Sequence, residues 1–188
     1  MPVTFPHFVT HYARGEPFLS VTRAPPEKWG EIAAGFTEGK VRARSRFADP
    51  DYLPRRVLVE ARLRAEFIAA GGEPRLANPI YCWVGRNARW DQQRTPGMRA
   101  YEVPFSVIPS TCVSFTFGDS LLTLDPDNLA LVRTLGRYVH PRAGRVYRLE
   151  EVRALLPEEP DLAEHLEVQL WMAPGSTIEG IELAVYTG

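Results

Sequence analysis

The sequence lacks several features that would decide its class at once. Its 188 residues include only two cysteines, Cys82 and Cys112, whose spacing fits neither a disulfide framework nor a cysteine zinc site. No apolar run is long enough to span a bilayer, and the chain does not open with a charged and then apolar leader. We therefore expect a cytoplasmic protein with free thiols and no contact with a membrane.

Motifs that hold phosphates or present nucleophiles are missing as well. The chain contains neither GxGxxG nor GxxxxGK followed by serine or threonine, the two common glycine-rich phosphate loops. It also has no GxSxG nucleophile elbow. These absences exclude P-loop nucleotide hydrolases, simple dinucleotide dehydrogenases and most α/β-hydrolases.

Lysine is scarce, and the basic charge is unevenly placed. Only Lys28 and Lys40 are lysines among the 22 basic residues, a bias typical of GC-rich or thermophilic genomes. The formal net charge of −1 divides into +5 for residues 1–94 and −6 for residues 95–188. The basic half could form a nucleic-acid face, or a solvated helix face with ordinary ion pairs. The arginines of such a face would be Arg42, Arg44, Arg46, Arg55 and Arg56.

Chain length and apolar pattern predict a single α+β domain over residues 1–188. Helices are expected at 26–36, 51–70, 128–138 and 149–156, and the buried stripe of the longest is expected to be Leu58, Ala61, Ala65 and Ile68. Because helices come early, strands come late and βαβ alternation is missing, we expect a mixed or mainly antiparallel sheet with the N-terminal helices packed on it. Strands are expected within 3–12, 80–84, 101–105, 112–117, 145–149, 166–171 and 181–186.

Histidine spacing gives no indication of a metal. His7 and His11 are four residues apart, which on a helix would suit one ion. Their surroundings favour a strand, where such residues lie about 13 Å apart, too far to share an ion. His140 and His165 have no ligand spacing to other residues. We expect no metal.

Polar residues follow two of the expected strands. Thr10, His11 and Tyr12 close the first, where His11 could hydrogen-bond a ligand hydroxyl. The strand ending in Phe117 breaks at a glycine into Asp119 and Ser120. That loop could present a carboxylate and a hydroxyl to a ligand, or form an Asx-type turn in which the aspartate bonds its own backbone.

A late strand carries the strongest candidate for chemistry. Glu167 and Gln169 are two residues apart, so on a strand their side chains point to the same face. If that face lines a cleft, Glu167 could act as an acid, a base or a stabiliser of developing positive charge. If the face is exposed, the pair is simply the solvent side of a sheet.

The whole chain resembles a poorly characterised bacterial family of proteins of this length. The resemblance rests on residues 10–14, 64–72, 81–85, 113–120 and 167–171, which read THYAR, RAEFIAAGG, YCWVG, VSFTFGDS and EVQLW.

The order of three of these pieces is also similar to that in ADP-ribosyltransferases, including the DNA-modifying toxin branch. This resemblance implies NAD as substrate, with His11 holding the ribose and Phe115 or Phe117 stacking on the nicotinamide. Glu167 would stabilise the oxocarbenium-like state as nicotinamide leaves. Gln169 stands where the arginine-specific branch has its glutamate.

Two further classes stay open beside NAD-dependent ADP-ribosyl transfer or a related glycosidic cleavage. One is a nucleic-acid binding module that uses the arginines between Arg42 and Arg64. The other is a protein-interaction domain acting on a host or partner enzyme, which exposed tryptophans would support. The enzyme hypothesis requires His11 and Glu167 to converge on one concave surface.

Overall fold

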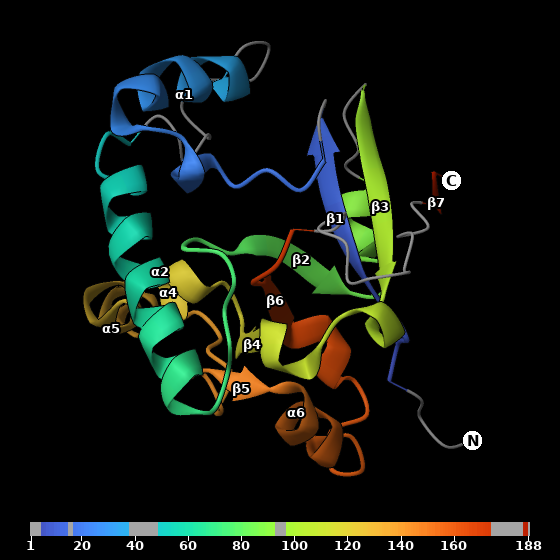
Figure 1. Ribbon diagram of the computed structural model, residues 1–188. Coiled ribbons are helices and arrows are strands. Elements are labelled where there is room, and N and C mark those ends of the chain that lie inside the picture. The colour runs from blue at the N-terminus through green and yellow to red at the C-terminus, as the bar shows by residue number, and fades with distance from the viewer. Residues whose placement is uncertain (1–4, 15–16, 38–48, 93–96, 174–185, 188) are drawn as a thin grey trace.

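The computed structural model describes residues 5–14, 17–37, 49–92, 97–173 and 186–187 (Figure 1). They form the expected α+β fold around one sheet, whose strand order is β5-β4-β6-β2-β1-β3-β7. Every strand pairing among the described residues is antiparallel. The strands are β1 Phe8–Arg14, β2 Ile80–Val84, β3 Met98–Pro104, β4 Val113–Phe117, β5 Tyr147–Arg148, β6 Leu166–Leu170 and β7 Tyr186–Thr187.

The helices are α1 Trp29–Thr37, α2 Tyr52–Ala69, α3 Ala88–Gln92, α4 Ser120–Thr123, α5 Pro126–Thr134 and α6 Leu149–Leu155. Four of these form where they were expected, with ends shifted by up to four residues, and two short helices, α3 and α4, were not expected. α2 ends where Gly71 adopts a left-handed conformation with φ of +89°, which a side chain would strain. Most of the strand expected at 181–186 lies outside the described residues.

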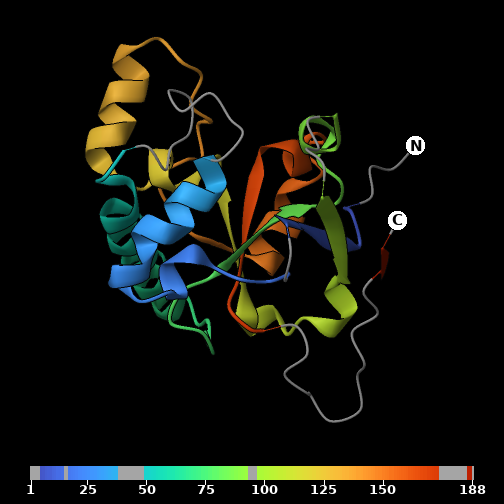
Figure 2. The ribbon, with the colours of Figure 1, turned by 90° about the horizontal axis from the view of Figure 1, so that it is seen from above.

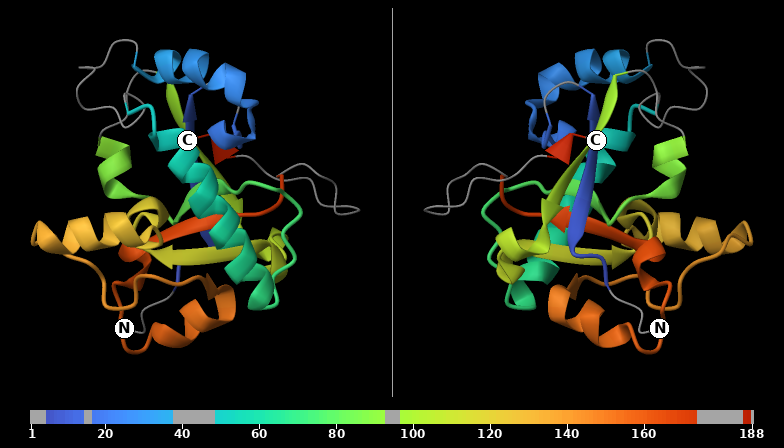
Figure 3. Two further views of the ribbon diagram at one scale, coloured as in Figure 1. Left: turned by 90° about the vertical axis from the view of Figure 1, so that its left-hand side faces the viewer. Right: turned by 90° about the vertical axis from the view of Figure 1, so that its right-hand side faces the viewer.

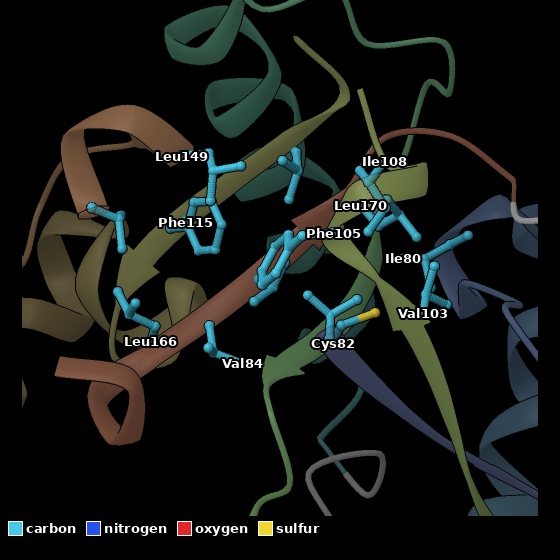
Figure 4. Close-up of a cluster of buried hydrophobic side chains, with 14 of the residues drawn as sticks. Ile80, Cys82, Val84, Val103, Phe105, Ile108, Phe115, Leu149, Leu166 and Leu170 are labelled. Carbon is cyan, nitrogen blue, oxygen red and sulfur yellow. The ribbon is translucent and has the colours of Figure 1, made fainter. Parts of the chain in front are cut away.

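One face of the sheet is apolar and forms the main core. The alternate residues of β2, β4 and β6 that point to this face are all buried (Figure 4). Phe105, the α6 residues Leu149 and Val152, and Leu162 cover them. The residues of β2, β4 and β6 in this core are Ile80, Cys82, Val84, Val113, Phe115, Phe117, Leu166, Val168 and Leu170.

The opposite face is covered by α2, which crosses in front of the sheet in the left view of Figure 3. Figure 2 shows that α1 lies on the same side of the sheet as α2. Leu53, Leu63 and Phe67 of α2 pack with Leu121 and Trp171 in a second apolar cluster. Within the same buried helix face lie two charged residues, Arg56 and Glu60.

The stripe expected for α2 was therefore wrong. Leu58 is 71% exposed and Ile68 is 45% exposed, and Ala61 and Ala65 are also exposed. The expected stripe has helical spacing but counts apolar residues alone. The sheet opposite α2 is polar, so the helix turns its mixed face, with Arg56 and Glu60, inward.

Candidate functional site

A row of five residues, from β3 to β4, crosses the sheet on the face covered by α2. The register pairs Glu102 with Thr10, Thr10 with Trp83, Trp83 with Glu167, and Glu167 with Thr116. Directly paired residues of antiparallel strands share a face. Tyr81, Gln169 and Ser114 form the next row on that face. Polar side chains from neighbouring strands thus meet a helix rather than open solvent.

Arg56 of α2 lies at the centre of this polar layer. Its guanidinium carbon is 3.8 Å from the centre of the Tyr81 ring, a cation–π contact. Its nitrogens lie 3.6 Å from Glu60 Oε1, 3.4 Å from Asp119 Oδ1 and 3.8 Å from Glu167 Oε2. Burial alone would lower the Arg56 pKa, but Tyr81 and the carboxylates outweigh that and raise it. One cation therefore joins three carboxylates.

Glu60 is held on both oxygens. Oε2 accepts hydrogen bonds from Thr22 Oγ1 at 2.6 Å and Asn78 Nδ2 at 2.8 Å, and Oε1 accepts from the Tyr81 hydroxyl at 3.1 Å. The residue is 1% exposed. Burial raises the Glu60 pKa, and these hydrogen bonds oppose the rise. Such a fully satisfied carboxylate fixes α2 to the sheet and has no free oxygen for a ligand.

Glu167 is held differently, by one oxygen only. Oε1 accepts from the Ser120 backbone N–H at 3.1 Å, from Ser120 Oγ at 2.5 Å and from Gln169 Nε2 at 3.1 Å. Among the residues described, no donor makes a hydrogen bond to Oε2, which faces Arg56 across 3.8 Å. The side chain is 10% exposed. One oxygen is thus fixed by three hydrogen bonds, while in the described part of the chain the other is held only by its ion pair with Arg56.

The surroundings of Glu167 favour strong electrostatic interactions. Burial raises the pKa of its carboxyl group, Arg56 opposes this, and Asp119 adds to the rise. In such a poorly hydrated position, a charge interacts more strongly with neighbouring charges than it would in water. An oriented carboxylate with one oxygen that accepts no hydrogen bond among the described residues can accept a proton, bind a hydroxyl or stabilise a cation.

Several of the predicted site residues do gather around Glu167. Ser120 and Gln169 bond its Oε1, and Thr10 lies in the same cross-strand row. Asp119 forms the predicted Asx-type turn, since its Oδ1 accepts from the Leu121 N–H at 3.0 Å as the N-cap of α4. The same oxygen lies 3.4 Å from Arg56 Nη1.

Tyr12 lies on the same face, farther along β1. Its ring stacks on Trp90 with centroids 6.0 Å apart, and its hydroxyl accepts from the Asn87 backbone N–H at 3.0 Å. Tyr12 is thus an aromatic neighbour of the polar face. No hydrogen bond joins it to Glu167 among the described residues.

His11 and the two phenylalanines do not join this site. His11 points to the apolar face, where its ring stacks on Phe18 at 5.1 Å, and its Nδ1 donates to the Tyr81 carbonyl at 2.9 Å. Phe115 and Phe117 lie on that same face and are 0% exposed. The surface expected to combine them with Glu167 is not formed, because alternate strand residues point to opposite faces.

The buried position of His11 makes stability depend on pH. Burial lowers the His11 pKa below 6.5. As the pH falls through this range, His11 therefore binds a proton more readily in the unfolded chain than in the folded one. We expect wild-type stability to fall between pH 7.5 and 5.5 by up to about 1.4 kcal/mol per pH unit through this group. In His11→Gln that contribution should vanish. Urea unfolding at both pH values measures it, and an identical slope in the variant would contradict the prediction.

The arginines of the expected nucleic-acid face have separate positions. Arg55 forms an ion pair with Asp49 at the surface. Arg56 is 5% exposed and faces the sheet, so its predicted contact with nucleic acid was wrong. Arg42, Arg44 and Arg46 lie outside the described residues.

Sequence reasoning missed the site roles of Arg56, Glu60, Tyr81 and Trp83. A usable signal was present in α2, where Arg56 and Glu60 are one helical turn apart and fall within the Leu53 and Leu63 stripe. A charged pair inside an apolar stripe indicates a polar partner across the interface. Nothing comparable singles out Tyr81 or Trp83 in the sequence.

Comparisons with known proteins give no further guidance. Within the described ranges, no group of three or more histidine, cysteine or acidic side chains could hold a metal, and none of the helices there could cross a bilayer. No protein-family model matches the chain, and no curated protein or solved structure is significantly similar to it.

Proposed function

We propose that Glu167, acting without His11, is the catalytic carboxylate of an enzyme that cleaves an N-glycosidic bond, with NAD as its substrate. The predicted convergence of His11 and Glu167 on one surface is not met, because His11 lies on the opposite face of the sheet, so this proposal rests on Glu167 alone. ADP-ribosyl transfer to an acceptor, or to water, is the reaction. The observation that carries this proposal is the asymmetric hold on Glu167, with three donors on Oε1 and none bonded to Oε2 among the described residues.

The reaction suits such a carboxylate. As the bond between ribose C1′ and the nicotinamide nitrogen breaks, its electron pair moves to that nitrogen and neutralises the cationic ring. Positive charge develops on the ribose, where Glu167 Oε2 would stabilise it more in the transition state than in the ground state. An acceptor oxygen then bonds to C1′ and loses its proton, for which Glu167 is a suitable base.

The rest of the polar face suits the ribose. Asp119, with its side chain 25% exposed, and Glu167 offer acceptors to sugar hydroxyls. Arg56 lies between them and carries five N–H donors. Thr10, Ser120 and Gln169 complete the polar surroundings from β1, α4 and β6.

Release of nicotinamide from NAD tests the proposal. We expect wild-type protein to release nicotinamide and Glu167→Gln to do so at least about a hundredfold more slowly, since the charge is removed and the shape kept. Glu164→Gln is the matched control, an exposed carboxylate just before β6, and should retain the wild-type rate. Circular dichroism establishes that each variant is folded.

Two results would overturn the assignment. Wild-type protein that releases no nicotinamide would exclude NAD cleavage. A folded Glu167→Gln variant with the wild-type rate would show that the carboxylate has no part in the reaction.

A further inference from the structure

The outward face of α2 carries an exposed apolar stripe, made of the four residues that the sequence predicted for the buried face. Leu58, Ala61, Ala65 and Ile68 are spaced by three, four and three residues, the heptad spacing of a helix–helix seam. The two larger side chains are 71% and 45% exposed, and both alanines are exposed as well. In the left view of Figure 3, no described helix or strand passes in front of α2. The helix therefore has a second apolar face besides the one that it buries against the sheet.

The shape of this stripe suits a second helix. Its middle consists of the methyl groups of Ala61 and Ala65, and small side chains at a contact let two helix axes come as close as about 8 Å. Leu58 and Ile68 lie about 15 Å apart along the axis, one on each side of the alanines, so larger side chains of a partner helix can pack between them. A bilayer is less well suited, because alanine methyl groups bury little apolar area.

The charged residues that border the stripe are all basic. Successive helical residues are about 100° apart, which places Arg55 and Arg62 on one side of the stripe and Arg64 on the other. The side chains of the first two are 39% and 43% exposed. Their ion pairs are with Asp49, which precedes the helix, and with Glu66, which lies farther from the stripe. A partner helix would therefore meet positive charge along both sides of its seam.

We infer that this face of α2 docks an amphipathic α-helix of another protein, with small and apolar residues in its seam and acidic residues along both sides. Carboxylates on that helix would pair with the bordering arginines and fix its orientation. A second copy of this chain would instead bring arginines against arginines, which charge repulsion opposes. The surface lies on the side of α2 away from Glu167, so this inference does not depend on the proposed function.

Two synthetic peptides test the charge requirement. Both are helices about three heptads long with leucine and alanine in the seam, and they differ only in having glutamate or lysine at the flanking positions. We expect the full-length protein to bind the glutamate peptide at least about tenfold more tightly than the lysine peptide at low salt, and this preference should shrink as salt is added. The double variant Arg62→Glu with Arg64→Glu should reverse the preference. Fluorescence anisotropy of the labelled peptides measures each affinity.

Single substitutions test whether the stripe is the contact surface. Leu58→Gln and Ala65→Arg alter exposed side chains, so the fold should be kept, and each should weaken binding of the glutamate peptide at least about fivefold. Leu135→Gln is the matched control, because this leucine is 63% exposed at the end of α5, outside the stripe, and its loss should leave the affinity unchanged. Circular dichroism establishes that each variant is folded.

Other outcomes would overturn the inference. If wild-type protein binds neither peptide, or binds both equally, an acidic helix is not the partner. Unchanged binding in Leu58→Gln and Ala65→Arg would exclude the stripe. Dimerisation that Ala65→Arg abolishes, measured by analytical ultracentrifugation, would assign the stripe to a second copy of this chain. Binding to vesicles of anionic phospholipid that Leu58→Gln abolishes would assign it to a membrane surface.

Discussion

Replacing Arg56 by methionine should lower the free energy of unfolding by about 3–5 kcal/mol, as is typical when one partner of a buried ion pair is removed. The guanidinium is the shared counter-ion of Glu60 and Glu167, and its side chain is only 6% exposed. Methionine fills much of the space but leaves both carboxylates without that charge. Urea unfolding at pH 8 measures the loss.

The pH dependence of this loss identifies its cause. Without Arg56, the pKa values of Glu60 and Glu167, already raised by burial, should rise further in the folded state. A raised carboxyl pKa favours folding below the unfolded value of about 4.5, and this stabilisation is lost as pH rises through the folded value. The loss caused by Arg56→Met should therefore be smaller at pH 4.5 than at pH 8.

A neighbouring arginine provides the control. Arg55 precedes Arg56 on α2 but forms its ion pair with Asp49 near the surface, with 39% of its side chain exposed. Arg55→Met should cost less than about 1 kcal/mol. Equal losses in the two variants, or a loss at Arg56 that does not change with pH, would contradict a buried charge network.

Trp171→Ala should destabilise the fold by about 3–5 kcal/mol, the range for removing a large buried aromatic side chain. Trp171 is 0% exposed, stacks on Phe67 of α2 with centroids 6.0 Å apart, and donates from Nε1 to Ser114 Oγ at 2.8 Å. It thus joins the apolar end of the α2 interface to the polar layer. Thermal or urea unfolding gives the change.

The phenylalanine variant separates the contribution of packing from that of the hydrogen bond. Trp171→Phe keeps the ring contact with Phe67 and loses the hydrogen bond to Ser114, whose hydroxyl still donates to Gln169 Oε1. It should cost about 1–3 kcal/mol, clearly less than the alanine variant. If both variants were equally unstable, the hydrogen bond rather than the packing would be the main contribution.

Local sequence patterns were sufficient for much of the fold and part of the site. Runs of β-type residues located β2, β4 and β6, and the alternation in β6 correctly put Glu167 and Gln169 on one face. The N-cap role of Asp119 also follows from local chemistry. Each of these depends on residues close together in the chain.

The errors concern relations between distant segments. The sequence predicts both Thr10 and His11 beside Glu167, although only Thr10 can share its face, because the register aligns Thr10 with Trp83 and Glu167. A shift of one residue exchanges the two faces of a strand. Pairing between β1 and β2 spans about seventy intervening residues, and nothing local fixes its register.

The rotation of α2 about its axis is a similar case. Its C-terminal end was predicted well because a terminating glycine is a local signal. Which face of α2 turns toward the sheet, however, depends on the polar layer, and strands far along the chain form that layer. Arg56 is stable inside only because Glu60, Asp119 and Glu167 are brought to it by folding.

The two buried thiols allow openings of the folded structure to be measured by chemical labelling. Cys82 lies between Tyr81 and Trp83 in β2 but points to the apolar core, and burial raises the pKa of its thiol. Cys112 is also buried, with Sγ 3.4 Å from the Glu73 carbonyl. Since thiolates are the reactive form, alkylation of either must await an opening of the structure. The rate of labelling at Cys82 therefore reports how often the apolar core opens, and any molecule that binds only the folded state should slow it.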